Sequence, residues 1–335
     1  MRISVVDVGS KTVRLVVVDA EGEVPLPVHT AKWRLRLGED VTPGGPVPEE
    51  AVERLVEAVA DAARTASRWN AAGPLAFATA VVRAAPNRLE VLRAVRERTG
   101  VQLCTLPGEV EAELTFLAAR RWMGWRSGPL ALLDIGGGSL EAAFGRGRLP
   151  DFVASLPLGA ARLTHEFFAG AADPPRPDEV RALRRKVRHQ LRDVGARIRW
   201  EGPRTAVATS RTFQQLGRLC GAAPGRLGPF ADRQLSRREL RTAVERLAVL
   251  PSGRRAALPG ISAPRAAQSL AGALVAHTAM KVTGLKTVTV CPWAIREGIL
   301  LRHVEDGPSW WAEVSRLDDE PVREPVPLRI ASTTR

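Results

Sequence analysis

The chain has 335 residues, a length typical of two domains, and its apolar fraction of 45% is ordinary for a globular protein. Lys and Arg total 49 against 36 Asp and Glu, and this net charge of +13 either favours polyanionic partners, such as nucleic acid, an anionic membrane or a phosphate-rich substrate, or reflects the use of Arg as an ordinary solvated residue. The cysteines Cys104, Cys220 and Cys291 lie far apart, and no apolar run approaches the ~20 residues of a membrane helix, which argues against a disulfide framework, a zinc site and a membrane span.

The first half of the chain is expected to alternate strands and helices. Segments rich in β-branched residues predict strands over 2–8, 12–19, 28–36, 75–79 and 101–105. Apolar residues at helical spacing predict helices over 48–69, 87–98 and 108–122. The chain enters its first strand at once, so no signal peptide is expected, and buried free thiols suit a reducing compartment; the predicted location is therefore cytoplasmic.

The second half repeats this alternation. Strands are predicted over 130–134, 140–144, 151–157, 205–208 and 286–291, and helices over 176–200, 211–220, 236–248, 264–280 and 294–303. The 176–200 helix carries cations that form either a polyanion-binding face or a solvated face: Arg181, Arg184, Arg185, Lys186 and Arg188.

One short pattern occurs in both halves. Asp7 and Asp134 each end an apolar strand, and each stands two residues before a turn-forming glycine and a second strand. This repetition predicts two related domains, 1–126 and 127–305, whose turns would face one cleft. In the tail, 306–335, the Trp310–Trp311 pair is expected to pack against the body, and the last residues, about 15, are expected to be disordered.

The two turns, Gly9-Ser10 and Gly136-Gly137-Gly138-Ser139, have the composition of an anion-binding site. Without Cβ atoms, successive amide groups converge on one phosphoryl oxygen. The carboxylates of Asp7 and Asp134 beside such a site predict a divalent cation, Mg²⁺ or Mn²⁺, because these ions prefer oxygen ligands. The alternative is a pair of ordinary hairpin turns with Asp as a turn residue.

The segment that begins at Gly108 is an acidic helix. Glu109 and Glu113 share one face, whereas Glu111 projects elsewhere. We therefore expect the first two to be solvated and Glu111 to point alone into a partly dry cleft, where a carboxylate suits a general base. Acids in a first helical turn also simply favour the helix dipole, so this alternative stays open.

Two further segments are candidates for phosphate contacts. Arg83 follows a strand end and is expected to clamp phosphate oxygens, unless it is an ordinary solvated arginine. Ser210, Arg211 and Thr212 open a helix directly after a strand, where free amide groups bind anions. A plain Ser/Thr helix cap explains the same residues equally well.

Taken in order, these segments resemble the exopolyphosphatase/guanosine pentaphosphate phosphohydrolase family, in its short actinobacterial form. The resemblance covers about nine tenths of the chain and rests on DVGSKTVRLVV at 7–17, ATAVVRAAPNR at 78–88, GEVEAELTF at 108–116, LLDIGGGSLEAAFG at 132–145, LGAARLT at 158–164, ATSRTFQQL at 208–216, LPGISAPRAAQSLAGALV at 258–275 and CPWAIREGILLR at 291–302. It implies an α/β fold of the two-domain actin-like, ribonuclease-H-like kind.

The resemblance also implies roles for individual residues. Glu111 matches the catalytic base, and Asp7, Asp134 and Glu141 match the acids near the metal. The positions implied to bind phosphate are Gly9, Ser10, Arg83, Gly136, Gly137, Gly138, Ser139 and the segment 209–212.

This chain departs from the family pattern at three of these places. Lys11 replaces the usual Asn of the first turn and is expected to add a phosphate contact or to alter the metal environment. Leu140 replaces a Thr, which removes a hydroxyl from the second turn, and Arg211 stands where many members have Gly. The chain also stops at residue 335, so the extra C-terminal helical domain of longer members is expected to be absent.

The implied activity is that of an exopolyphosphatase, which releases terminal orthophosphate from inorganic polyphosphate by metal-assisted attack of water. Short chains are the expected substrates. Guanosine pentaphosphate 5'-phosphohydrolase activity and a non-catalytic sensor of polyphosphate or alarmone nucleotides are the alternatives, and an actin-like sugar or acetate kinase is a further rival on the same fold. No specific nucleic-acid or membrane partner is expected, and a homodimer is left open.

Overall fold

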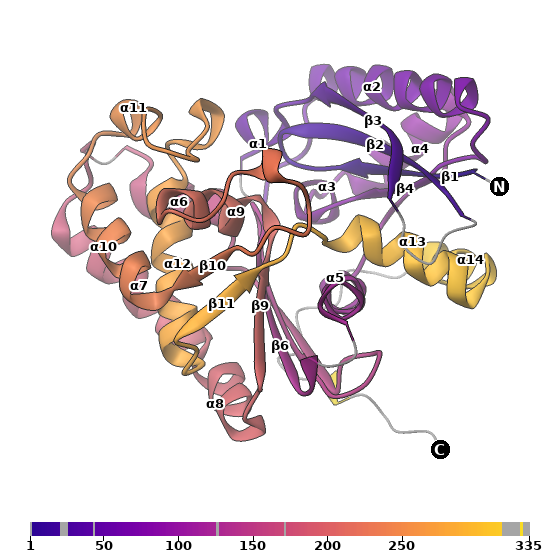
Figure 1. Cartoon of the computed structure of the whole chain (residues 1–335). Helices are drawn as coiled ribbons and strands as arrows, with labels where there is room; N and C mark the ends of the chain where they lie inside the picture. Colours follow the sequence, from indigo (N-terminus) through magenta and orange to yellow (C-terminus); the bar gives the residue numbers. More distant parts are fainter. Residues whose placement is uncertain are drawn as a thin grey trace. The chain divides into compact units, whose positions relative to one another are not determined.

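The computed structural model describes residues 2–20, 26–42, 44–124, 127–170, 172–316 and 329–330 (Figure 1). Contacts divide the chain into two compact units, Met1–Leu114 with Ile295–Glu324 and Thr115–Ala294 with Pro325–Arg335. This division differs from the expected boundaries after residues 126 and 305. The reason is that the segment after Ile295 packs into the core of the first unit, as described below.

The first unit is built on a five-stranded mixed sheet with the order β3-β2-β1-β4-β5. β1 is antiparallel to β2 and parallel to β4. The strands are β1 (Arg2–Val8), β2 (Thr12–Asp19), β3 (Pro27–Arg34), β4 (Leu75–Ala78) and β5 (Leu103–Thr105). The helices are α1 (Leu37–Asp40), α2 (Glu49–Arg68), α3 (Ala80–Arg83), α4 (Arg88–Thr99), the first part of α5 (Gly108–Met123), α13 (Ile295–Asp306) and α14 (Ser309–Arg316).

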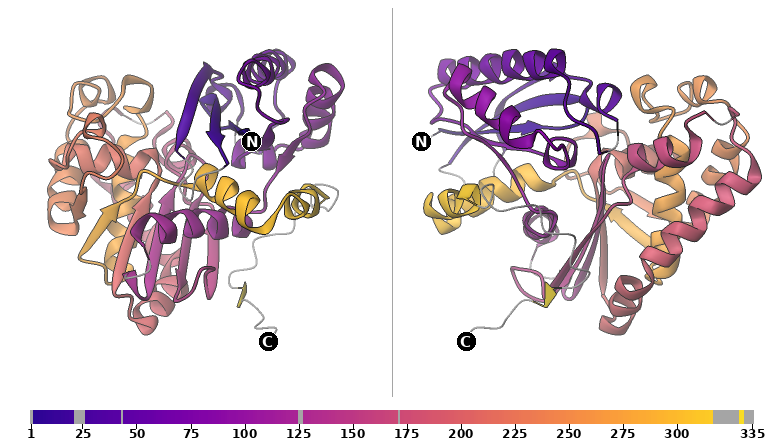
Figure 2. Two further views of the ribbon diagram at one scale, coloured as in Figure 1. Left: turned by 45° about the vertical axis from the view of Figure 1, so that its right-hand side comes forward. Right: turned by 180° about the vertical axis from the view of Figure 1, so that it is seen from behind.

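Helices cover both faces of this sheet, because alternate residues of β1 are apolar on each side. Val6 and Val8 share a buried cluster with residues of α2 and α4. Ile3 and Val5 share another with residues of α13 and with Trp310 of α14, on the opposite face (Figures 1 and 2). The buried Trp310 confirms that the first part of the tail packs against the body.

The second unit contains a seven-stranded sheet with the order β10-β11-β9-β6-β7-β8-β12. The strands are β6 (Leu130–Ile135), β7 (Leu140–Gly145), β8 (Phe152–Leu156), β9 (Thr205–Thr209), β10 (Gln234–Ser236), β11 (Thr287–Val290) and β12 (Arg329–Ile330). The helices are α6 (Ala160–Phe168), α7 (Pro177–Gln190), α8 (Arg192–Glu201), α9 (Ser210–Leu219), α10 (Arg237–Ala248), α11 (Ser252–Arg255) and α12 (Ser269–Val282), with short 3₁₀ turns at Gly225–Leu227 and Ala263–Arg265.

One face of this second sheet packs under helices. Ala131, Leu133 and Ile135 of β6 belong to a large buried cluster with residues of α6 to α10 and α12. The alternate residues of the same strand, including Asp134, therefore lie on the opposite face. This alternation determines which polar side chains of the sheet share a surface.

The two sheets repeat one topology. In each, a first strand lies between an antiparallel second strand and a parallel fourth strand, and the third strand flanks the second. The internal similarity around Asp7 and Asp134 thus corresponds to the same place in both sheets.

Some predicted elements differ from the observed ones. The segment expected to form one helix over 176–200 forms two helices, α7 and α8, which meet at Leu191. Of the tail expected to be disordered, residues 329–330 form β12 against β8, and the remainder of it lies outside the described residues. Among the helices that the structure describes, none combines the length and apolarity needed to cross a membrane.

Candidate functional site

The two glycine turns have the same backbone geometry. In the first unit the last strand pair is Val8 with Val13, and the Gly9 amide donates to the Thr12 carbonyl at 3.0 Å. In the second unit the last pair is Ile135 with Leu140, and a matching bond of 2.9 Å closes the turn. In each turn four residues therefore lie between the two members of the last pair, and the aspartate stands one residue before that pair.

The N-terminus of α6 holds the second turn in place. The Ala160 amide donates to the Gly136 carbonyl, and the amides of Ala161 and Arg162 both donate to the Gly137 carbonyl, all at 3.0 Å. Gly159 allows this approach, because a Cβ atom there would lie 2.3 Å from the Gly137 carbonyl oxygen. The turn carbonyls thus face the helix.

The amide groups of the same turn remain available for a ligand. None of the backbone hydrogen bonds in the described part of the chain uses the amides of Gly137 or Gly138 as donors. Successive amides that share one orientation bind anions, and the positive end of the α6 dipole adds to their field. The turn therefore has the chemistry of a phosphate-binding site.

The first turn has a related support. The Gly38 amide of α1 donates to the Ser10 carbonyl at 2.7 Å, and the amides of Leu35 and Arg36 donate to the Lys11 carbonyl. A Cβ atom at Gly38 would lie 3.2 Å from that of Ser10, so the helix again lies close to the turn.

Four oxygen-bearing side chains share the sheet face that carries Asp134. Glu141 is the direct antiparallel partner of Asp134, and Thr209 is its parallel partner on β9. The Thr209 hydroxyl donates to Asp134 Oδ2 at 2.7 Å, and the Ser155 hydroxyl donates to Glu141 Oε1 at 3.1 Å. The structure thus brings together Asp134 and Glu141, which the family resemblance implied to lie near one metal.

Burial controls the protonation of Asp134. It raises the pKa of this carboxyl to about 6, against the opposing effect of hydrogen bonds from Thr209 and Ser210. Ser210 itself has a φ of 86°, in the left-handed region that non-glycine residues rarely occupy. Such backbone strain clusters at functional sites, and here it positions the first residue of α9 beside Asp134.

The donor set of the second unit fits a hard divalent cation. Asp134, Glu141, Ser155 and Thr209 offer only oxygen atoms. No group of three or more His, Cys, Asp or Glu side chains suited to a metal occurs among the described residues. Mg²⁺ commonly uses one or two carboxylates together with water and substrate phosphates, so the two carboxylates are sufficient.

In the first unit, Glu111 forms an ion pair with Arg83. Glu111 is 8% exposed, and its carboxylate accepts a hydrogen bond from Arg83 Nη1, which also donates to the Leu106 carbonyl at 2.6 Å. The expectation that Glu111 stands alone was wrong. A carboxylate on α5 and a guanidinium at the end of α3 meet because β4 and β5, which precede these helices, are neighbours in the sheet.

Arg296 is a site residue that the sequence reasoning missed. Arg296 Nε on α13 lies 3.7 Å from Asp7 Oδ2, on the sheet face that α13 covers. Burial raises the pKa of Asp7, whereas the charges of Arg296 and Arg14 oppose this effect. The position of Arg296 within the CPWAIREG segment was the available signal.

The remaining candidates have local roles in the described structure. Arg211 is exposed and donates to Gln214 one turn later on α9, and Thr212 is buried with its hydroxyl unpaired. Leu140 is fully buried in the apolar cluster under the helices. Leu140 pairs with Ile135 and thus lies on the sheet face opposite to Asp134. Glu113 is not simply solvated either, because it pairs with Arg302.

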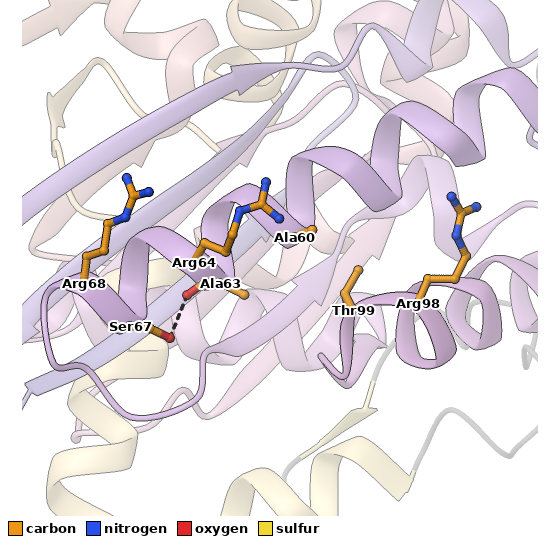
Figure 3. A pocket seen from close by; sticks show the side chains of 7 residues that line it. All are labelled: Ala60, Ala63, Arg64, Ser67, Arg68, Arg98 and Thr99. Carbon is orange, nitrogen blue, oxygen red and sulfur yellow. Dashed lines mark hydrogen bonds between the residues drawn. The ribbon is translucent and has the colours of Figure 1, made fainter.

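A surface groove of about 430 Å³ lies elsewhere in the first unit (Figure 3). Its arginines are largely neutralised, since Arg64 pairs with Asp61 and Arg98 pairs with Glu53. None of the predicted site residues lines this groove, whose lining is Ala60, Ala63, Arg64, Ser67, Arg68, Arg98 and Thr99.

Comparison with known proteins supplies the evolutionary context. The model of the Ppx/GppA phosphatase family matches residues 15–306. An uncharacterized protein of Streptomyces coelicolor is 78% identical over 335 residues, covering 100% of both chains. Exopolyphosphatase 1 of Mycobacterium leprae is 45% identical over 307 residues, covering 91% of this chain and 90% of the relative. Exopolyphosphatase 2 of Mycobacterium tuberculosis is 30% identical over 321 residues, covering 90% of this chain and 98% of the relative.

Solved structures agree on the fold. An exopolyphosphatase from Cytophaga hutchinsonii superposes with a TM-score of 0.83 at 21% identity, covering 92% of this chain and 99% of that one. The Aquifex aeolicus PPX-GPPA enzyme gives a TM-score of 0.77 at 25% identity, covering 90% of this chain and 99% of that one. The α/β, two-domain actin-like fold predicted from the sequence is thereby confirmed.

Proposed function

The chain belongs to the Ppx/GppA phosphatase family, and on this premise we propose that it is an exopolyphosphatase that releases terminal orthophosphate from inorganic polyphosphate. The observation that carries this proposal is the second glycine turn, whose Gly137 and Gly138 amides have no backbone acceptor among the described residues. The relatives named exopolyphosphatase support the substrate class.

The turn of the second unit binds the terminal phosphate. Its amides donate to phosphoryl oxygens, and α6 fixes their direction by holding the carbonyls of Gly136 and Gly137. Phosphoryl transfer depends mainly on positioning and on charge neutralisation, so a rigid turn is more effective than a mobile one.

Asp134 and Glu141 would hold a divalent cation, Mg²⁺ or Mn²⁺, beside this phosphate. When bound, the cation would neutralise charge on the phosphate oxygens. Thr209 and Ser155 orient the two carboxylates by donating hydrogen bonds to them. Such bonds fix the direction of a ligand carboxylate.

Glu111 acts as the general base. It takes a proton from water while the water oxygen forms a bond to the terminal phosphorus. The bridging P–O bond breaks, and the chain shortened by one phosphate leaves as an anion. Arg83 holds the carboxylate of Glu111 in one orientation through their ion pair, and Arg83 is also a candidate to contact the substrate phosphates.

The experiment measures phosphate release from polyphosphates of different length and from guanosine pentaphosphate, with Mg²⁺ and no acceptor. We expect the highest kcat/KM for polyphosphate, with short chains preferred. A clear preference for guanosine pentaphosphate would favour the alternative within the same family. Release only after a sugar or acetate is added would indicate a kinase, and binding without release would indicate a sensor.

A further inference from the structure

Three helices of the second unit carry a cluster of basic side chains. Figure 1 shows α7, α10 and α12 together, and α12 contacts both of the others. Apart from Val282 at its end, the residues of α12 that are not buried are His277 and Lys281. The cluster, which we call the basic cluster, consists of Arg184 on α7, Arg237 and Arg241 on α10, and His277 and Lys281 on α12.

These side chains lie close enough to influence one another. Burial and the charges of Arg184, Arg237, Lys281 and Arg241, in this order, lower the pKa of His277. The packing of α12 against α7 and α10 accounts for this effect, because it brings cations of all three helices near the imidazole. Each positive charge in such a group raises the free energy of the others unless an anion is present.

Acidic side chains neutralise little of the positive charge of the cluster. Arg241 pairs with Glu245 one turn away, at a largely exposed site where such pairs stabilise weakly. In the described part of the chain, Arg184, Arg237 and Lys281 take part in no ion pair. The sequence of α12 contains no acidic residue. The cluster therefore keeps most of its positive charge.

One member of the cluster is also held in a defined position. Arg184 Nε is buried without a hydrogen-bond partner, so the base of its guanidinium is packed against the protein. A side chain fixed in this way loses less conformational entropy when an anion binds than a fully solvated arginine does.

The cluster is separate from the glycine turn. Gly272, near the start of α12, lies against Thr212 and Ala160, and Ala160 donates to the turn. His277 and Lys281 follow Gly272 by five and nine residues on the same helix, which corresponds to about 7.5 and about 13.5 Å along its axis. A ligand that fills the turn with one phosphate does not thereby reach the cluster.

We infer that the basic cluster is a second phosphate-binding site, which binds a stretch of inorganic polyphosphate away from the glycine turn. This inference rests on the proposed function. A linear chain with a charge at every phosphate suits several cations on neighbouring helices. Single-stranded nucleic acid is the weaker candidate, because its binding sites add aromatic side chains for base stacking and the cluster contains only His277 in that category.

The test measures binding of polyphosphate about 100 units long to the protein carrying Glu111→Gln, which suppresses hydrolysis. The cluster variant adds Arg184→Gln and Lys281→Gln. The matched control adds Arg181→Gln and Arg188→Gln, two exposed residues of α7 outside the cluster. We expect the cluster variant to bind roughly 10-fold more weakly and to lower the slope of log Kd against log salt by about 1.4, by analogy with single-stranded nucleic acids. The control should change affinity by less than about 3-fold.

Other outcomes would overturn the inference. Equal weakening of both double variants would mean that general surface charge alone is involved. If single-stranded RNA binds as tightly as polyphosphate, and if the cluster variant weakens its binding by the same factor, the cluster is a nucleic-acid surface. In the active protein, the double substitution Arg184→Gln and Lys281→Gln should leave kcat/KM for tripolyphosphate unchanged. A lower kcat/KM would mean that the cluster belongs to the phosphate site at the glycine turn. A parent protein that hydrolyses no polyphosphate would refute the proposed function instead, without affecting the binding comparison.

A measurement on the unaltered cluster guards against misfolding of the variants. Bound polyphosphate offsets the neighbouring cations, so the pKa of His277 should rise when it is added. Nuclear magnetic resonance of the histidine ring in the Glu111→Gln protein, followed from pH 8 to pH 5, measures this change. The His277 titration should move to higher pH with polyphosphate, and an unchanged curve at saturation would refute binding at the cluster.

Discussion

Glu111 and Arg83 form an ion pair in the first unit, and this pair joins the proposed base to a residue that the sequence had assigned to phosphate. The guanidinium also donates to the Leu106 carbonyl, which fixes its position. Arg83 therefore orients Glu111 in this structure.

We predict that Glu111→Gln lowers kcat about 10²- to 10⁴-fold, because it removes the proton acceptor and leaves the side-chain shape almost unchanged. The amide oxygen can still accept a hydrogen bond from Arg83, so the fold should persist. Phosphate release measures the activity, and thermal unfolding checks the fold. Glu109→Gln, on the same helical turn, is the control and should retain normal turnover. Normal turnover in a folded Glu111→Gln protein would refute the assignment.

We predict that activity depends on Mg²⁺ or Mn²⁺ and that Glu141→Gln weakens Mn²⁺ binding at least 10-fold, because it removes one of the two carboxylates that face each other on β6 and β7. Removal of metal by EDTA and dialysis should abolish phosphate release, and added Mg²⁺ should restore it. Calorimetry of Mn²⁺ binding provides a readout independent of turnover. Glu90→Gln, at an exposed position of α4, should bind Mn²⁺ normally. Full activity after metal removal would show that the acids are structural.

We predict that Asp134→Asn stabilises the metal-free protein above pH 7 by about 1–3 kcal/mol. Burial raises the pKa of Asp134 from 3.8 to about 6, so the folded state holds this proton more tightly than the unfolded state. The stability linked to this carboxyl is therefore fully present below pH 4 and is lost as pH rises through about 6.

Urea unfolding in EDTA at pH 4 and pH 8 tests this prediction. The difference in unfolding free energy between Asp134→Asn and the parent should be small at the lower pH and should favour the variant at the higher pH. A variant that is less stable at pH 8 would mean that the hydrogen bonds from Thr209 and Ser210 outweigh the effect of burial.

We predict that Gly159→Ala destabilises the protein by about 1–3 kcal/mol and lowers kcat/KM more than 10-fold. The new Cβ atom would lie 2.3 Å from the Gly137 carbonyl oxygen, so the turn must move away from α6. Gly147→Ala is the matched control, because a Cβ atom there meets no atom within 4 Å. Thermal unfolding and phosphate release measure the two effects, and equal behaviour of both variants would contradict the supporting role of α6.

The sequence by itself determined the local features of this protein. The repeated strand, aspartate and glycine turn around Asp7 and Asp134 predicted both hairpins, because β-branched runs and small turn residues act over a few neighbouring positions. The helix predicted over 108–122 matches α5, which places Glu111 in its first turn. Together with the family resemblance, these local signals were sufficient for the fold.

The tertiary structure alone decided which residues meet. Arg296 lies beside Asp7 although almost the whole chain separates them, because the apolar face of α13 packs onto the first sheet. The pairing of Glu111 with Arg83 and the alignment of Asp134 with Glu141 likewise follow from strand order and register. Side-chain periodicity shows which face of an element is apolar, but long-range packing selects the surface that this face covers.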